Sequence, residues 1–493
     1  MREQRQPRQG RAIAAEVGPR RVAADISVQL LARVLNLIIG IFVTLLIVRG
    51  LGTAGFGMWS AIFAVGQIVN SLGELGLNEI AVSRAAGDPE READWVGALL
   101  SMRLLICVPM AILSAIAILI VAPTAEARLA GVIIALSTLL GPATALAVIF
   151  QLRVRNDVRM AIMTFNSVVW GAGVVAVTVL SGGIVAFAMA FVATYAITGM
   201  LTAALALRMG EVHMRGTRRL WRSMLRVGIP AGIGGLLITL YVKLDQILVL
   251  EIAGTRQAGL YGADYRLLEQ IQFIPTAVMT TLFPMIAYAY RSRMTQAHSM
   301  LQSAGEYLAM ASLPVLAFTI VASRPIVTVL FGAKFAGAAA ALPMLAGAFV
   351  SISFGYLVGH MVVVLELQRR FVLFAAIALV LNASLNLAFI PEFGFVAAAW
   401  ITVVTELTVM LLSMRMVLRK MRMRPRLGRL WRVSLAACAM GLVTWLAHGE
   451  GVPFAALLAV APLVYLPCLS VLGVLRVDEL KRLLARERAT PAA

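Results

Sequence analysis

Residues 96–121 read VGALLSMRLLICVPMAILSAIAILIV and contain one charged side chain, Arg103. An α-helix rises about 1.5 Å per residue, so this stretch can cross a hydrocarbon layer of about 30 Å. Similar apolar segments fill the chain, and they predict an all-α polytopic membrane protein with about 14 transmembrane helices. The predicted spans are 28–48, 59–80, 96–121, 129–150, 160–180, 184–207, 227–250, 260–288, 307–330, 341–365, 371–390, 395–414, 433–447 and 454–475.

The charge distribution supports this interpretation and excludes nucleic-acid binding. The net charge of +19 would suit a phosphate-binding protein, but 61% of the residues are hydrophobic and only 14% are charged. With a cytoplasmic N-terminus, 33 of the 43 Lys and Arg residues fall on the inner side and four in outer loops. This asymmetry predicts a multi-pass protein of a bacterial cytoplasmic (inner) membrane with both termini cytoplasmic, whose basic loops meet membrane lipids.

The order of the spans predicts two six-helix lobes followed by two more helices. The longest polar interruptions fall after the sixth and the twelfth span, and both are rich in arginine. The predicted parts are a basic cytoplasmic N-tail (1–27), an N-lobe (28–207), a cytoplasmic linker (208–226), a C-lobe (227–414), a basic cytoplasmic loop (415–432), helices 13 and 14 (433–475) and a cytoplasmic C-tail (476–493).

The sequence lacks the residue patterns that several functional classes require. The four histidines stand at no metal-ligand spacing, and the three cysteines lie inside predicted spans, where a thiol is usually a small apolar group. No phosphate-binding Gly-Lys-Ser/Thr loop occurs, and the apolar N-terminal segment lacks a small-residue cleavage site. We therefore predict no catalytic residues, no metal site, no bound cofactor and no signal peptide, with H+ or Na+ coupling left open.

A short internal repeat supports two lobes. Gly52, Thr53 and Gly57, followed by Trp59 and Ala61, recur 202 residues later as Gly254, Thr255, Gly259, Tyr261 and Ala263. Both copies fall in the outer loop that joins the first two helices of a lobe. Repeats six helices apart have parallel topology and are related by an axis along the membrane normal.

Six blocks in this order resemble the multidrug, oligosaccharidyl-lipid and polysaccharide exporter superfamily, and within it the bacterial polysaccharide-biosynthesis flippases. The blocks are RGLGTAGFGMWS (49–60), GELGLNEIAVSR (73–84), VGIPAGIGGLLITLYVKLDQILV (227–249), AGLYGADYRLLEQIQFIPTAVMTTLFP (258–284), LFGAKF (330–335) and LNASLNLAFIPEFGFVAAAW (381–400). The resemblance implies an alternating-access carrier that is not an enzyme. It also implies a polyprenyl-diphosphate-linked glycan as substrate, moved from the cytoplasmic to the periplasmic leaflet for exopolysaccharide, capsule or O-antigen synthesis, and polysaccharide polymerase machinery as a partner.

Ionisable residues within the N-lobe spans are candidates for binding the anionic head, because a charge inside a membrane is costly unless it is paired or lines water. Arg33 and Arg103 lie in the cytoplasmic half of their predicted helices, and we expect them to bind the diphosphate. Glu74 is their expected counter-ion and a candidate for coupling or gating. The alternatives are snorkelling of the arginines to the interface and a purely structural ion pair.

The C-lobe offers a second group in the periplasmic half. Lys243 and Arg266 are candidates for substrate binding, and Asp245 and Glu269 for coupling or gating. Arg266 and Glu269 are three residues apart and share a helix face, whereas Lys243 and Asp245 are two apart and point in different directions. The LDQI setting of Asp245 matches a position where the resembled family commonly has an acid. We expect Asp245 and Arg266 to form a charge pair that changes during transport.

Two further residues lie in the spans that follow. Glu406 lacks an evident local partner, so it is a candidate for proton coupling, although a partner from another helix is an equal alternative. Asn386, four residues after Asn382, is a candidate for binding glycan hydroxyls, with interhelical hydrogen bonding as the alternative.

Two other functions of the same superfamily remain open at this point. A peptidoglycan lipid-precursor flippase also has fourteen helices and a cationic centre, whereas a cation-coupled multidrug exporter typically has twelve helices and an acidic cavity. A membrane-embedded glycosyltransferase would need a large outer loop with acidic catalytic residues. The predicted outer loops have no room for one.

Overall fold

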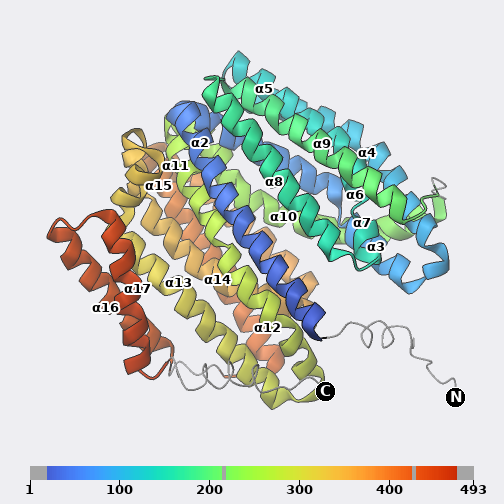
Figure 1. Ribbon diagram of the computed structural model, residues 1–493. Coiled ribbons are helices and arrows are strands. Elements are labelled where there is room, and N and C mark those ends of the chain that lie inside the picture. The colour runs from blue at the N-terminus through green and yellow to red at the C-terminus, as the bar shows by residue number, and fades with distance from the viewer. Residues whose placement is uncertain (1–18, 214–217, 425–428, 475–493) are drawn as a thin grey trace. The chain divides into compact units, whose positions relative to one another are not determined.

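The structure is a computed structural model that describes residues 19–213, 218–424 and 429–474. These residues form helices and no strands, as Figure 1 shows. Twelve of the continuous helical stretches are long and apolar enough to cross a membrane. They account for the fourteen predicted spans, because two stretches each contain two spans joined across a kink. The predicted all-α membrane fold is confirmed, although the C-tail and most of the N-tail lie outside the described residues.

The helices divide into two compact units, which we describe separately. Unit 1 comprises residues up to 50, residues 72–119 and residues 124–232, and unit 2 comprises residues 51–71, 120–123 and 233 onward. The units follow different boundaries from the predicted lobes, since residues 51–71 group with the C-terminal part. The lobe assignment stays a prediction.

Unit 1 is built around α9 (Ile184–Met209), which packs against α5 (Ala125–Leu136) and α8 (Asn156–Val179). The first part of α2 (Pro19–Glu74) belongs to this unit, as does the start of α10 (Arg218–Ala253). The remaining elements are α3 (Leu77–Gly87), η1 (Pro89–Arg91), α4 (Glu92–Val121), η2 (Ser137–Leu140), α6 (Gly141–Ala145) and α7 (Val148–Leu152).

One predicted span of this unit is wrong as a single helix. The stretch 129–150 is divided among α5, η2, α6 and α7. The Ser137 hydroxyl donates to the Ile134 carbonyl (2.6 Å) and the Thr144 hydroxyl to the Gly141 carbonyl (3.0 Å), which are local bonds that compete with a regular helix. Pro142, which lies between Ser137 and Thr144, lacks the amide hydrogen that a continuing helix needs.

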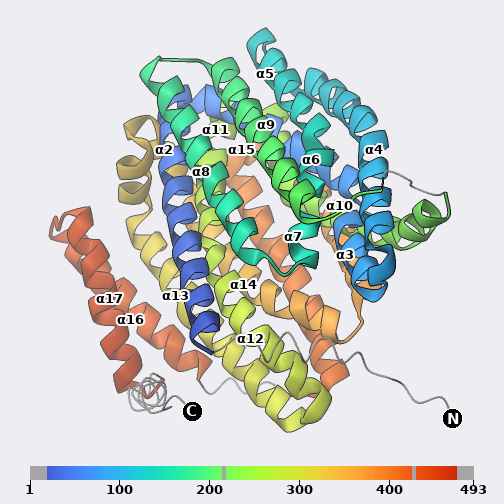
Figure 2. The same cartoon turned by 45° about the vertical axis from the view of Figure 1, so that its right-hand side comes forward.

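Unit 2 contains the later helices and most of the polar residues considered below. Its helices after α10 are α11 (Thr255–Ile271), α12 (Phe273–Ser292), α13 (Met294–Phe331), η3 (Ala333–Ala340), α14 (Leu342–Val364), α15 (Gln368–Met421), α16 (Leu430–Gly449) and α17 (Phe454–Val471). The last two lie side by side and pack on α13, as both views show (Figures 1 and 2).

The predicted linker and basic loop are partly helical. Residues 218–226, assigned to the linker, form the first turns of α10, and residues 415–421 of the basic loop continue α15. Residues 214–217 and 425–428 lie outside the described part. The helix ends therefore extend further than the apolar pattern indicates, because basic side chains are good helix formers.

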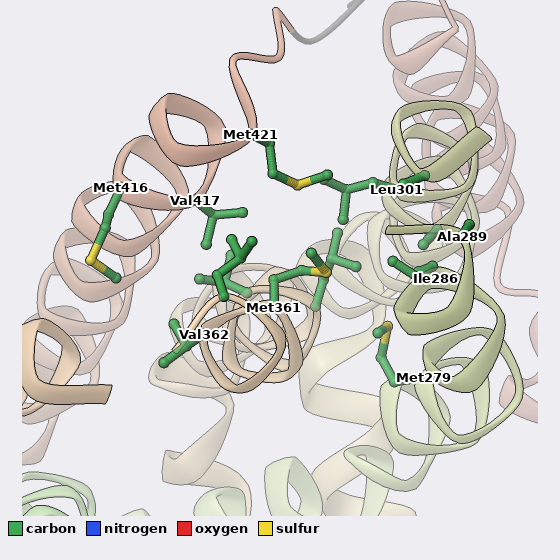
Figure 3. Close-up of a cluster of buried hydrophobic side chains, with 14 of the residues drawn as sticks. Met279, Ile286, Ala289, Leu301, Met361, Val362, Met416, Val417 and Met421 are labelled. Carbon is green, nitrogen blue, oxygen red and sulfur yellow. The ribbon is translucent and has the colours of Figure 1, made fainter. Parts of the chain in front are cut away.

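The core of unit 2 is rich in methionine. Met279, Met361, Met416 and Met421 pack together with Leu301 and other apolar residues of α12 to α15 (Figure 3). Unbranched methionine fills irregular gaps between helices. Large apolar side chains also point outward, including Leu180 (80% exposed) and Leu463 (72% exposed), which suits a surface that faces lipid.

The two copies of the internal repeat contact each other within unit 2. Gly52 (φ 66°) and Gly254 (φ 86°) both adopt the positive φ that favours glycine. A Cβ added to Gly57 would overlap the Thr255 carbonyl, and one added to Gly259 would overlap the Thr53 carbonyl. The contact is reciprocal, as a two-fold relation between the copies requires.

Candidate functional site

Arg103 is a buried cation in unit 1. It is 8% exposed on α4, and its guanidinium donates to the Gly73 carbonyl (3.4 Å) and the Asn78 side-chain oxygen (3.2 Å). Its Nε is buried without a hydrogen-bond partner, and the negative charge of Glu74 acts on it. The guanidinium thus ties α4 to the end of α2 and to α3 while retaining one unused donor. Arg33 lies on α2, but its side chain is outside the described part of the structure.

The second cationic group, in unit 2, is held by one carboxylate. Glu269 on α11 pairs with Lys243 of α10 through Oε1 and with Arg266 through Oε2 (2.7 Å). Lys243 also lies over the Tyr265 ring, with its Nζ 5.2 Å from the ring centroid. The Lys243 and Arg266 side chains are 7% and 37% exposed, so the lysine is buried and the arginine is accessible. The group has a formal net charge of +1.

Aromatic residues from α2 surround this group. Its pocket is lined by Phe56, Trp59 and Phe63 of α2, together with Gln67 and Gln246. Cationic, aromatic and amide side chains therefore meet in one place within unit 2. This combination offers contacts to an anionic group and to a polar ring at the same site.

Asp245 lies in a separate, fully buried cluster (1% exposed). Its Oδ2 accepts from Tyr261 (3.0 Å) and Thr402 (2.8 Å), and its Oδ1 accepts from Asn386 (3.0 Å). The Asn386 amide also donates to Asn382 (3.0 Å), while its own carbonyl oxygen is buried with no partner. The cluster joins α10, α11 and both halves of α15 through one charged group and four neutral ones.

The expected Asp245–Arg266 charge pair is absent from the described contacts, where Arg266 pairs with Glu269 and Asp245 with neutral groups. Tyr261, which contacts Asp245, precedes Arg266 by five residues, and five helical residues correspond to roughly 140° of rotation around the axis. The two side chains therefore leave α11 on different faces. The pair is therefore not formed in this structure, and because it was expected to change during transport, it stays a prediction for other conformations.

The structure also shows where Asn386 and Glu406 lie. Asn386 is 0% exposed and bonds across helices, so this structure favours interhelical bonding over glycan contact. Glu406 makes no hydrogen bond or ion pair with any residue that the structure describes, and it borders a cavity. In the described ranges no three His, Cys, Asp or Glu side chains group as metal ligands.

Sequence reasoning missed several participants. Asn78, Tyr261 and Thr402 were not proposed as site residues, yet each bonds a predicted one. Tyr261 was visible as an aromatic position of the repeat, and Asn382 as the partner of Asn386 at helical spacing. Nothing in the sequence distinguishes Thr402 from the other hydroxyl residues in the spans.

Comparison with known proteins places these groups in context. The profile of a family described as polysaccharide biosynthesis protein matches residues 22–289, just over half of the chain. A comparison with curated sequences finds no match.

Solved structures share the fold at low sequence identity. An inward closed lipid II flippase, MurJ, has a TM-score of 0.75 at 15% identity, covering 90% of this chain and 98% of that protein. An inward-facing multidrug resistance transporter of the MATE family has a TM-score of 0.65 at 16% identity, covering 79% of this chain and 94% of that protein. A transporter of the same superfamily from Pyrococcus furiosus gives 0.58 at 18% identity, covering 79% and 95%.

Proposed function

Because this chain belongs to the polysaccharide biosynthesis protein family, a family of membrane flippases, we propose that it moves polyprenyl-diphosphate-linked oligosaccharide units from the cytoplasmic to the periplasmic leaflet. A diphosphate and a glycan cannot enter hydrocarbon without losing their hydration, which is expensive when nothing replaces it. A flippase supplies fixed polar groups in place of that water. The proposed step is a movement in which no covalent bond forms or breaks.

The observation that supports this substrate class is the Lys243, Arg266 and Glu269 group beside three aromatic rings. Its net charge of +1 suits an anionic head, and the accessible Arg266 can donate two parallel hydrogen bonds to phosphate oxygens. The partly exposed ring of Phe63 can pack on a sugar ring, and the exposed amide of Gln67 can bond hydroxyls. Arg103 in unit 1 is a further buried cation with an unused donor.

Coupling to a monovalent cation is the second part of the proposal, with Asp245 as the charged ligand. Its cluster brings together a carboxylate, two amide side chains and two hydroxyls, and oxygen ligands of this kind suit a hard cation. The buried Asn386 carbonyl oxygen without a partner fits such a site, because a bound cation would satisfy it. We favour Na+ over H+, since a proton needs one acceptor and this cluster supplies several.

The direct test is a flipping assay with the purified protein in proteoliposomes. A polyprenyl-diphosphate oligosaccharide with a fluorescent sugar is placed in both leaflets, and a membrane-impermeant reductant quenches the outer one. Active protein exposes nearly all of the label to quenching, whereas protein-free liposomes protect about half. Equal protection in both preparations would contradict the proposal.

A second substrate distinguishes the alternatives within the superfamily. A lipid-linked disaccharide that carries a peptide stem replaces the oligosaccharide in the same assay. Faster flipping of the peptide-bearing lipid would favour a peptidoglycan-precursor flippase, the activity that the name of the structurally similar lipid II flippase indicates for that protein. Export of a lipophilic cation with no flipping of either lipid would favour a drug exporter.

The proposed location is a bacterial inner membrane, with both termini cytoplasmic. The polysaccharide polymerase on the periplasmic side is the proposed downstream partner, because it consumes the flipped units. The strong bias of Lys and Arg toward one set of loops supports this orientation.

A further inference from the structure

A cavity of about 440 Å³ lies inside unit 2, between α10, α11, α14 and α15. Most of its lining is apolar or aromatic, including Tyr241, Tyr265 and Tyr356, and the one carboxylate on its wall is Glu406. His360 also lines the cavity, and its Nδ1 lies 2.7 Å from the Tyr356 carbonyl. An acidic group that faces a space large enough for several waters is available to a ligand.

Polar groups along this side of α15 lack partners. The hydroxyl oxygens of Thr405 and Ser413 are buried with no hydrogen bond, and Ser413 lines the cavity. Other hydroxyl residues of these helices donate to the carbonyl four residues earlier, as Ser353 does to Phe349 (2.7 Å) and Thr408 to Val404 (2.7 Å). Buried unsatisfied oxygens need an explanation, and a bound ion or water is one.

The cavity wall lies one helical turn from residues of the Asp245 cluster. On α15, Glu406 follows Thr402 by four residues, and on α10, Tyr241 precedes Asp245 by four. Four residues correspond to about 6 Å along a helix, so the cavity wall begins one turn from the buried carboxylate. The charges of Glu406 and Asp245 act on each other.

We propose that this cavity is a cation vestibule: a second, weaker Na+ site formed by Glu406 and Ser413, through which the ion reaches Asp245. One carboxylate and neutral oxygens suit a monovalent hard cation, and the remaining volume lets the ion keep part of its water. When Glu406 is ionised, its negative charge also raises the local concentration of cations in the cavity. The proposal rests on the coupling role of Asp245 given above and adds a site that this role does not require.

The test is equilibrium binding of radioactive 22Na+ to the purified full-length protein in detergent. The wild type should bind up to two ions per chain, with unequal affinities. Asp245→Asn should retain only the weaker site, and combining it with Glu406→Gln should weaken the remaining binding by at least about tenfold, because the attracting charge is lost. Glu406→Gln alone should keep the tighter site.

A variant that leaves all charges in place tests the cavity itself. A Cβ on Gly355 or Gly359 would meet no atom within 4 Å, and both glycines line the cavity. Gly355→Leu should therefore fill the vestibule without a backbone clash and remove the weaker site. Gly235→Leu is the matched control, since that glycine is also on a helix of unit 2, has open space around it and does not line the cavity.

The outcomes separate the two proposals. If Asp245→Asn retains a weak site that neither Glu406→Gln nor Gly355→Leu changes, the vestibule is wrong and the Asp245 site stands. If Asp245→Asn leaves both components intact while Glu406→Gln removes one, the coupling proposal fails and the vestibule stands. The absence of saturable binding to wild-type protein that elutes as a single folded species would overturn both.

Discussion

Glu269 holds two cations at once, so neutralising it should cost more than removing either cation. Glu269→Gln leaves Lys243 charged and 7% exposed, without the acidic group that it pairs with in the described contacts. Breaking a buried pair in this way costs about 3 kcal/mol, toward the lower end of the usual range because the Glu269 side chain is 23% exposed. Arg266→Gln should cost less than about 1 kcal/mol, since that side chain is 37% exposed and water replaces much of the interaction.

The double variant Lys243→Met/Glu269→Gln separates charge from shape. It removes the buried charge together with its partner, so it should recover most of the loss caused by Glu269→Gln. The free energy of unfolding is measured by SDS titration in mixed micelles, with Arg266→Gln as the control for the exposed half of the group. Equal losses of unfolding free energy in Glu269→Gln and Arg266→Gln would show that the lysine is not buried as described. A loss in the double variant that equals the sum of the Lys243→Met and Glu269→Gln losses would show the same.

Three further predictions follow from the fold and the site. In a background without native cysteines, Glu211→Cys should resist a membrane-impermeant maleimide in intact cells, and strong labelling would reverse the proposed orientation. Arg103→Ala should slow flipping at matched protein levels. Arg103→Lys should recover part of the rate, because lysine retains the positive charge but cannot donate to Gly73 and Asn78 in the two directions that the guanidinium reaches. Undiminished flipping by Arg103→Ala would show that Arg103 is not part of the proposed site. Gly57→Ala and Gly259→Ala should each lower the free energy of unfolding by about 1–3 kcal/mol, because the added methyl group meets backbone atoms of the other copy. Gly235→Ala is the control and should have little effect, because that glycine has open space around it. Unequal losses for Gly57→Ala and Gly259→Ala would argue against a reciprocal contact.

The helices could be predicted because membrane spans obey a simple constraint. Each must be long and apolar, and every predicted span overlaps helix in the described part of the chain. The interruption of 129–150 escaped prediction because it depends on which local hydroxyl bonds form, and a hydropathy pattern does not contain that information. The kinks at Gly52 and Gly394 also join helices that the sequence presents as separate spans.

The polar residues were easier to find than their partners. Charged residues within spans are few, so Lys243, Asp245 and Glu269 were easy to identify. The spacing of Arg266 and Glu269 indicated that they share a helix face, and in the structure they form an ion pair. Partners such as Thr402 come from helices more than a hundred residues away. Estimated depth in the membrane cannot replace the rotation of each helix about its axis, which here places Asp245 and Arg266 in separate clusters.

The reciprocal contact at Gly57 and Gly259 explains why the internal repeat is visible only in one short stretch. Within a single polypeptide, each copy of the motif is the other's binding partner, as the two faces of a homodimer interface are. A side chain gained by either copy meets the backbone of the other, so neither copy can diverge alone. The two halves also carry different polar groups, with Arg103 in one and the Asp245 cluster in the other.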